Sequence, residues 1–269
     1  MKSLPGVIII VAILVWSLYC DFTQGIELQT VKLLVLRGLC IIAVFSLSSF
    51  LSQAYGLIGD NGLFPISSSL KKIDTFLATV DDQSEEKNVY NNIITVTMMR
   101  FVHLKFFHAS NQNKRLYRVI CIDIIFALLG CVYPHPIILL YLYHSIYAIK
   151  RIAGPFMQYQ WDILLLEALC FGIVLSIACD HITTTLALWS FKILLFRLMF
   201  GSGIVKLFSS DPSWSKTYDA MSYHFETQPL PNTLARTIHL HAPKWLFKAL
   251  TIGTLVNEVL LPLLTLIGV

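Results

Sequence analysis

The sequence of 269 residues is 56% hydrophobic and only 13% charged, with a mean hydropathy of +0.68. These values lie outside the range of soluble globular domains and predict an integral membrane protein. The net charge of +4 is modest, and the basic residues are spread over the predicted loops, which argues against nucleic acid as a partner. The six cysteines stand in or beside apolar segments without a C-x-x-C pair. We therefore interpret them as small buried hydrophobic residues rather than as a disulfide framework or a zinc site.

Two apolar segments predict two membrane spans within residues 1–52. No small-x-small cleavage site follows the first, Val7–Tyr19, so we expect a retained membrane helix rather than a cleaved signal peptide. The second, Leu33–Ser52, has Lys32 and Arg37 at its start, where long basic side chains can reach the membrane interface.

The region of residues 53–118 predicts amphipathic and interfacial structure. Its first tract, residues 56–65, has turn-forming residues and predicts a loop returning from the membrane; these residues are Gly56, Gly59, Gly62 and Pro65. Helical spacing of apolar residues predicts an amphipathic helix over Leu70–Val80. The segment Ile93–Ala109 carries too many charges for the hydrocarbon and predicts a helix in the headgroup layer.

Residues 119–269 predict a helical bundle with a motif loop at 209–245. The runs Val119–Tyr133 and Ile137–Ile149 are each too short for a straight span. They are either short helices shielded by protein or a hairpin that borrows flanking residues, and Asp123 in the first must be paired or hydrated. Further spans are predicted at Ile163–Ile182, Ala187–Phe208 and Leu246–Ile267, with Thr183–Thr185 as the link between the first two of these.

The predicted fold is an all-α polytopic transmembrane bundle of six or seven spans, organised as a single membrane domain without an internal repeat. If the spans alternate, the 53–118 region and the 209–245 loop share the side that is rich in lysine and arginine. By the positive-inside rule this side is the cytoplasm, or the matrix for a mitochondrial inner membrane.

Ionisable residues inside the predicted spans are the strongest structural signal. Arg197 and Lys206 lie on one predicted helix, while Glu167 and Glu258 lie on two others. Charges at membrane depth are costly unless paired, so they form either a clamp between helices or part of an ion path, and we favour the clamp because repeat symmetry is missing. Gly201 and Gly203, between the two basic residues, predict a close approach of a neighbouring helix.

The predicted loop contains two histidine pairings that could carry chemistry. His224 and Glu226 are two residues apart, as are His239 and His241, so each pair would share one face of a strand and could ligate a metal or act as acid and base. No third ligand follows at recognisable spacing. We therefore expect structural hydrogen bonding, no catalysis, no metal and no cofactor.

Four ordered blocks resemble the lipase maturation factor family of membrane proteins. They are residues 56–65, residues 160–167 with Trp161, residues 196–207, and residues 222–231 with Tyr223, His224, Glu226, Gln228 and Pro229. The resemblance covers the N-terminal half of the family and implies a helical membrane protein that assists the maturation of secreted lipases in the endoplasmic reticulum. Family members continue into further membrane helices and a soluble C-terminal region.

Two functions follow from these observations. We favour a structural accessory subunit of a larger membrane assembly, such as a mitochondrial respiratory complex, because the family's C-terminal region is missing and no N-x-S/T sequon occurs. Its partners would be other membrane subunits and bilayer lipids, in the mitochondrial inner membrane. The alternative is an endoplasmic-reticulum membrane factor with a lipase client.

Overall fold

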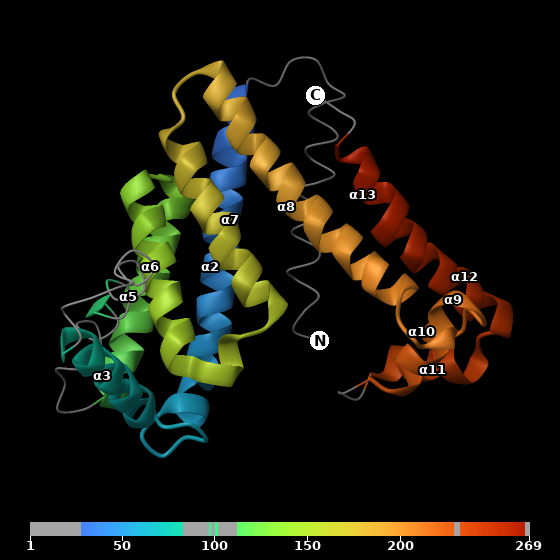
Figure 1. Cartoon of the computed structure of the whole chain (residues 1–269), viewed down its shortest axis with the longest axis horizontal. Helices are drawn as coiled ribbons and strands as arrows, with labels where there is room; N and C mark the ends of the chain where they lie inside the picture. Colours follow the sequence, from blue (N-terminus) through green and yellow to red (C-terminus); the bar gives the residue numbers. More distant parts are fainter. Residues whose placement is uncertain (1–27, 83–96, 98–99, 102–111, 229–231, 267–269) are drawn as a thin grey trace. The chain divides into compact units, whose positions relative to one another are not determined.

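The computed structural model describes residues 28–82, 97, 100–101, 112–228 and 232–266, and the predicted first span Val7–Tyr19 lies outside them (Figure 1). Every regular element in this part of the chain is a helix, which confirms the predicted all-α class. The chain divides into two compact units at Leu188, within one long helix. Whether both belong to a single domain, as the sequence predicts, stays a prediction.

The helices of the N-terminal unit, in chain order, are α2 (Leu28–Ile58), α3 (Ile66–Asp82), α5 (Gln112–Val132), α6 (Pro136–Ala153), the 3-10 turn η1 (Gly154–Met157), α7 (Gln160–Ile177) and the start of α8 (His181–Leu207). Those of the C-terminal unit are the rest of α8, then α9 (Pro212–Ser215), α10 (Ala220–Glu226), α11 (Thr233–His241), α12 (Lys244–Leu255), the π-helical turn η2 (Val256–Leu260) and α13 (Leu261–Leu264).

Four of these described helices are long and apolar enough to cross a membrane. They are α2, α7, α8 and the continuous helix from Lys244 to Leu264. The count is lower than the six or seven predicted, because α5 and α6 are not among the four and the predicted first span lies outside the described residues. The prediction of a membrane protein built from helices is confirmed.

Helix α2 is the centre of the N-terminal unit and contacts α5, α6 and α7 (Figure 1). Its buried residues recur every three or four positions and therefore lie on one face; they are Leu36, Leu39, Cys40, Ala43, Leu47, Phe50, Ala54 and Ile58. Since lipid is as apolar as these side chains, close packing and polar contacts hold such helices together.

Two basic residues of α2 bind the ends of its neighbours. Lys32 Nζ donates to the carbonyl of Ala178 at 2.5 Å, at the end of α7, and Arg37 Nη2 donates to the carbonyl of Val132 at 3.3 Å, the last residue of α5. Terminal carbonyls lack helical partners and carry the negative end of the helix dipole. The expectation that these side chains only reach towards the interface is therefore incomplete, because they also satisfy helix ends.

Helices α5 and α6 form a hairpin around a buried carboxylate. Both extend beyond their apolar runs, but neither is among the four described helices that could cross a membrane, so the choice between shielded short helices and a membrane hairpin stays a prediction. Asp123 of α5 is fully buried and accepts hydrogen bonds from Tyr141 Oη at 2.8 Å and from Ser145 Oγ. The two donors stand four residues apart on α6 and share one face of it. Of the two predicted alternatives, a paired or a hydrated Asp123, the structure shows the first.

The glycine-rich tract after α2 is partly helical. Gly56, predicted in a loop, lies inside α2, because the helix continues to Ile58. The turn begins afterwards: the Gly59 N–H donates to the Tyr55 carbonyl at 3.1 Å, and the Gly62 N–H donates to the Gly59 carbonyl at 2.8 Å. The Asp60 N–H donates to Asn113 Oδ1 at 2.8 Å and so ties this turn to the start of α5.

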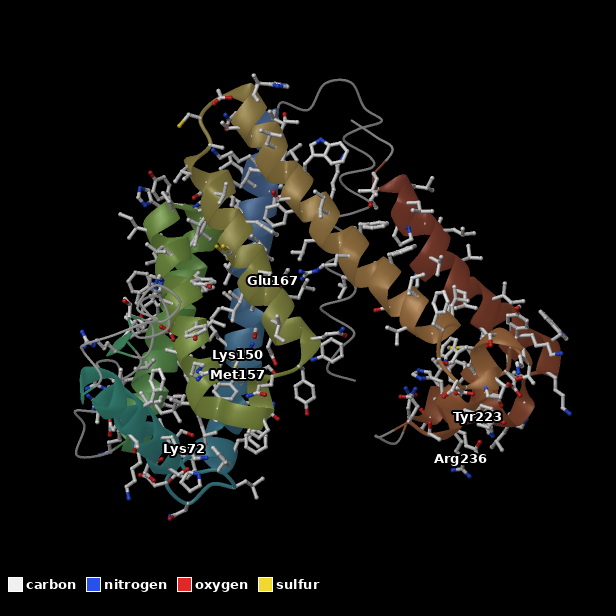
Figure 2. The ribbon with its side chains drawn as sticks, in the orientation of Figure 1. Lys72, Lys150, Met157, Glu167, Tyr223 and Arg236 are labelled. Atoms are coloured by element: carbon white, nitrogen blue, oxygen red, sulfur yellow. The ribbon has the colours of Figure 1, made fainter. Side chains whose placement is uncertain are left out.

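Helix α3 is amphipathic, as predicted. Ile66, Leu70 and Ile73 are buried, while Lys71 and Lys72 are exposed on the other face. The helix contacts α6 at the end of the unit where Figure 2 labels Lys72, Lys150 and Met157.

The chain reverses between α6 and η1 at Gly154, whose φ of 56° lies in the left-handed region that favours glycine. A Cβ atom there would lie 3.4 Å from the ring of Phe64, so the glycine-rich tract packs directly against this reversal.

Residues Thr183–Thr185 were predicted as a link, but they are helical, because α8 begins at His181. Asp180 caps this helix: its Oδ1 accepts from the Thr183 N–H at 2.9 Å and its Oδ2 accepts from Thr183 Oγ1 at 2.8 Å. These bonds, the backbone one above all, lower the pKa of the Asp180 carboxyl. The true link is residues 178–180.

We predict that Asp123→Ala destabilises the N-terminal unit, because the Tyr141 and Ser145 hydroxyls both lose their carboxylate acceptor. The expected loss in the free energy of unfolding is about 1–3 kcal/mol for each hydroxyl that finds no substitute. Thermal unfolding of the purified protein in detergent measures it. The control is Asp60→Ala, since only the backbone of that exposed residue makes the bond to Asn113. Equal unfolding temperatures for the two variants would contradict the assignment.

Candidate functional site

In the C-terminal unit, a glycine allows α8 to approach η2 closely. A Cβ atom on Gly203 would lie 3.0 Å from the backbone carbon of Glu258 and 2.6 Å from Val259 Cγ2. Gly201, by contrast, has no atom within 4 Å of its Cβ position. Of the two glycines singled out in the sequence, the structure uses Gly203 for helix contact and leaves Gly201 exposed.

An ion pair joins the same two helices. Lys206 Nζ of α8 donates to both carboxylate oxygens of Glu258, at 2.5 Å from Oε1. The side chains are only 26% and 16% exposed, and Lys206 Nζ also lies 5.4 Å from the centroid of the Trp214 ring. Glu258 belongs to the π-helical turn, a distortion that occurs frequently at functional sites. The pair forms a clamp between helices, as the sequence suggested.

The other two predicted charges lie on α7 and α8. Glu167 is half-buried on α7 (Figure 2), and Arg197 is exposed on α8. The contact of Arg197 with Glu167 or Glu258 stays a prediction. Trp161 is 62% exposed in the first turn of α7, where its ring stacks on that of Tyr159.

The predicted loop at 209–245 contains three short helices. Helix α10 carries Tyr223, His224 and Glu226, and α11 carries His239 and His241. The strand conformation on which the histidine pairings depended is therefore wrong. On a helix, two residues that are two positions apart are rotated by about 200° around the axis, so their side chains lie on nearly opposite sides. Among the residues that the structure describes, no three His, Cys, Asp or Glu side chains gather to hold a metal. Pro229 lies outside those residues.

Ring contacts and hydrogen bonds hold α10 and α11 against α12. The buried Phe247 of α12 contacts the ring of Phe225 at 6.1 Å and that of His239 at 6.3 Å between centroids. The Met221 N–H donates to Thr251 Oγ1 of α12 at 3.2 Å. The exposed His224 ring approaches Gln228, with 2.9 Å between the two Nε2 atoms. Figure 2 shows Tyr223 and Arg236 on this cluster of short helices.

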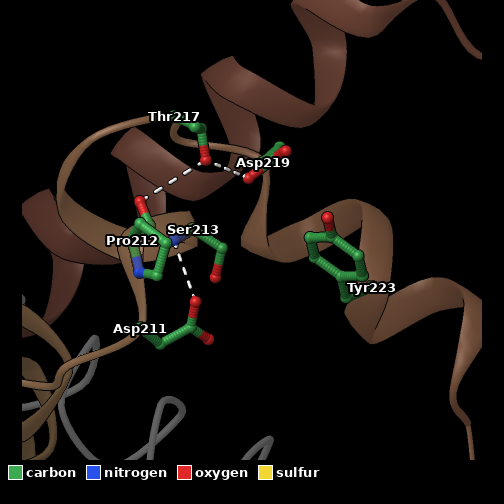
Figure 3. Close-up of a pocket in the computed structure, with 6 residues that line it drawn as sticks. All are labelled: Asp211, Pro212, Ser213, Thr217, Asp219 and Tyr223. Carbon is green, nitrogen blue, oxygen red and sulfur yellow. Dashed lines mark hydrogen bonds between the residues drawn. The ribbon is translucent and has the colours of Figure 1, made fainter.

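A cavity of about 290 Å³ lies between α9 and α10 (Figure 3). It is lined by Asp211, Pro212, Ser213, Thr217, Asp219 and Tyr223. Asp211 caps α9, with its Oδ1 accepting from the Ser213 N–H at 2.9 Å, and this bond lowers the pKa of the Asp211 carboxyl. Asp219 Oδ1 accepts from Thr217 Oγ1.

The sequence reasoning missed this cavity, although one local signal was present. Asp211 followed by Pro212 is typical of a helix start, with the acid as N-cap and proline at the first helical position. The sequence does not predict that Tyr223 lies next to the start of α9, because its position depends on how the chain turns between Lys216 and Ala220.

We predict that Gly203→Ala destabilises the C-terminal unit by about 1–3 kcal/mol, because the added methyl group overlaps Val259 and the Glu258 backbone. Gly201→Ala is the matched control on the same helix. It should be neutral or stabilising by up to about 1 kcal/mol, because alanine favours helices and the site is open. Unfolding in detergent measures both, and equal effects would refute the close contact.

We predict that Lys206→Met or Glu258→Gln alone costs about 3–5 kcal/mol, because each leaves a partly buried charge without its partner. The double variant should recover a large part of that loss. A double-mutant cycle on thermal unfolding measures the coupling, with the exposed Lys248→Met as the control for removing a lysine. Additive losses in the double variant would show that the pair contributes nothing.

Comparisons with known proteins identify the chain's relatives. The family model for the lipase maturation factor transmembrane domain matches residues 30–269. Lipase maturation factor 2 of Homo sapiens is 28% identical over 247 residues, which cover 85% of this chain and 33% of that protein. Lipase maturation factor 1 of Homo sapiens is 27% identical over 246 residues, covering 88% of this chain and 41% of that protein. Lipase maturation factor 2 of Gallus gallus is 38% identical over 134 residues, covering 45% and 18%.

The chain thus spans between a third and about two fifths of the length of the human relatives. No solved structure matches it. The predicted role as a subunit of a mitochondrial respiratory complex finds no support in these names, and the alternative of lipase maturation fits them better. The family match covers nearly the whole sequence, so this chain belongs to the lipase maturation factor transmembrane domain family.

Proposed function

We propose that this chain acts as the membrane domain of a non-enzymatic lipase maturation factor in the endoplasmic-reticulum membrane. The observation that carries the proposal is the family match over residues 30–269, which includes the helices of both units. The names of the relatives supply the client class, a lipase.

In this proposal the clamp positions the surface that contacts the client. A lumenal client requires the 209–245 segment to face the lumen, which is opposite to the side that the positive-inside rule predicts for it. The contact at Gly203 and the Lys206–Glu258 pair hold α8 against η2. Helices α9 to α11 follow directly on α8, and Phe247 and Thr251 of α12 anchor α10 and α11. These short helices would therefore present a fixed polar surface beside the apolar spans, and the exposed His224 and Glu226 of α10 belong to it.

The test is lipase secretion from cells depleted of their own lipase maturation factors. Because the relatives are longer, this chain is expressed both alone and in place of the matching segment of the human protein. The double variant His224→Ala/Glu226→Ala should reduce secreted lipase activity severalfold without changing the level of the chain. Lys216→Ala, an exposed substitution in the same segment, is the control.

Native gel electrophoresis of a mild-detergent extract, followed by mass spectrometry, tests the competing hypothesis of an accessory subunit. Recovery of the chain in fixed ratio within a mitochondrial complex, with lipase secretion unaffected by its removal, would contradict this proposal.

A further inference from the structure

The cavity between α9 and α10 has a lining that suits a positive charge (Figure 3). Asp211 and Asp219 bring two carboxylates to it, Tyr223 brings an aromatic ring, and none of its six lining residues is basic. Asp211 uses Oδ1 to cap α9, and Asp219 uses Oδ1 to accept from Thr217. Both acids are thereby held in place by local bonds.

The size of the cavity favours an organic cation over a metal ion. Calcium needs six to eight oxygen ligands at about 2.3–2.6 Å, a tight shell that two carboxylates in a half-open cavity do not provide. The volume of about 290 Å³ is close to the lower end, roughly 300 Å³, of clefts that hold small molecules. A quaternary ammonium group combines low hydration with affinity for aromatic faces, as in choline recognition.

The position of the cavity in the chain indicates where such a cation comes from. Asp211 follows closely on Leu207, the last residue of the membrane-length helix α8. Exposed aromatic side chains mark the same end of this unit: Phe208 at 83%, Tyr223 at 55% and Trp245 at 68%. Aromatic residues with a polar tip gather at the headgroup level of membranes. At that depth, the abundant organic cation is the headgroup of a zwitterionic phospholipid.

We propose that the cavity lined by Asp211, Asp219 and Tyr223 binds the ammonium group of a phosphatidylcholine headgroup. The carboxylates supply the charge and the Tyr223 ring supplies an aromatic face. The buried Ser213 lines the same cavity, and its N–H holds Asp211 in place by donating to Oδ1. This lipid site is independent of the proposed contact with a client, which uses His224 and Glu226.

The experiment uses the full chain purified in maltoside micelles and titrated with dihexanoylphosphatidylcholine by calorimetry. Asp211→Asn/Asp219→Asn removes both charges but keeps the amide oxygens that accept from Ser213 and Thr217, so the fold is retained. Affinity should fall about tenfold, because two partly exposed charge contacts are lost. Tyr223→Leu should weaken binding severalfold, whereas Tyr223→Phe, which keeps the ring, should stay within about twofold of the unmodified chain.

Two competitor probes and one control complete the design. Dihexanoylphosphatidylglycerol lacks the ammonium group and should bind at least about tenfold more weakly. Choline chloride should also bind more weakly than the lipid, and equal affinity would overturn the lipid in favour of a soluble amine. Asp60→Asn, an exposed acid in the other unit, should change nothing. Equal binding of the two lipids, or an unchanged affinity in the double Asn variant, would overturn the proposal.

Discussion

A polar group inside a membrane-spanning helix must find its partner within the protein, and the ion pair of Lys206 with Glu258 meets this requirement in the C-terminal unit. Both side chains are largely buried, so their attraction is little weakened by water and fixes α8 against the helix that begins at Lys244. Gly203 makes the pair possible, because a larger residue would hold the two backbones apart. The short helices between α8 and α12 are held at both ends as a result.

The same constraint explains the N-terminal unit. Lys32 and Arg37 of α2 bind terminal carbonyls of α7 and α5, and Asp123 is enclosed by two hydroxyl groups of α6. Each of these contacts links two helices whose apolar faces alone would pack without a defined register. Polar contacts therefore select which helices meet, while apolar packing fills the space between them.

The two proposed activities use different faces of one small cluster of helices. The client surface uses exposed side chains of α10, whereas the lipid site uses the cavity between α10 and α9. The side of the membrane on which this cluster lies stays a prediction. It does not depend on whether the α5–α6 hairpin crosses the membrane, because a hairpin returns the chain to the side it left. That the 53–118 region and the 209–245 segment share a side also stays a prediction.

The sequence by itself determined the all-α membrane class, the amphipathic α3 and the family, because these depend on composition, periodicity and ordered motifs. Only the tertiary structure decided that Glu258 pairs with Lys206, that Gly203 rather than Gly201 lies at the helix contact, and that the 209–245 segment is helical. Histidines two positions apart are compatible with a strand as well as with a helix, since this spacing alone does not determine the backbone conformation. The cavity depended on a turn that brings Tyr223 to Asp211, and no local pattern encodes that distance.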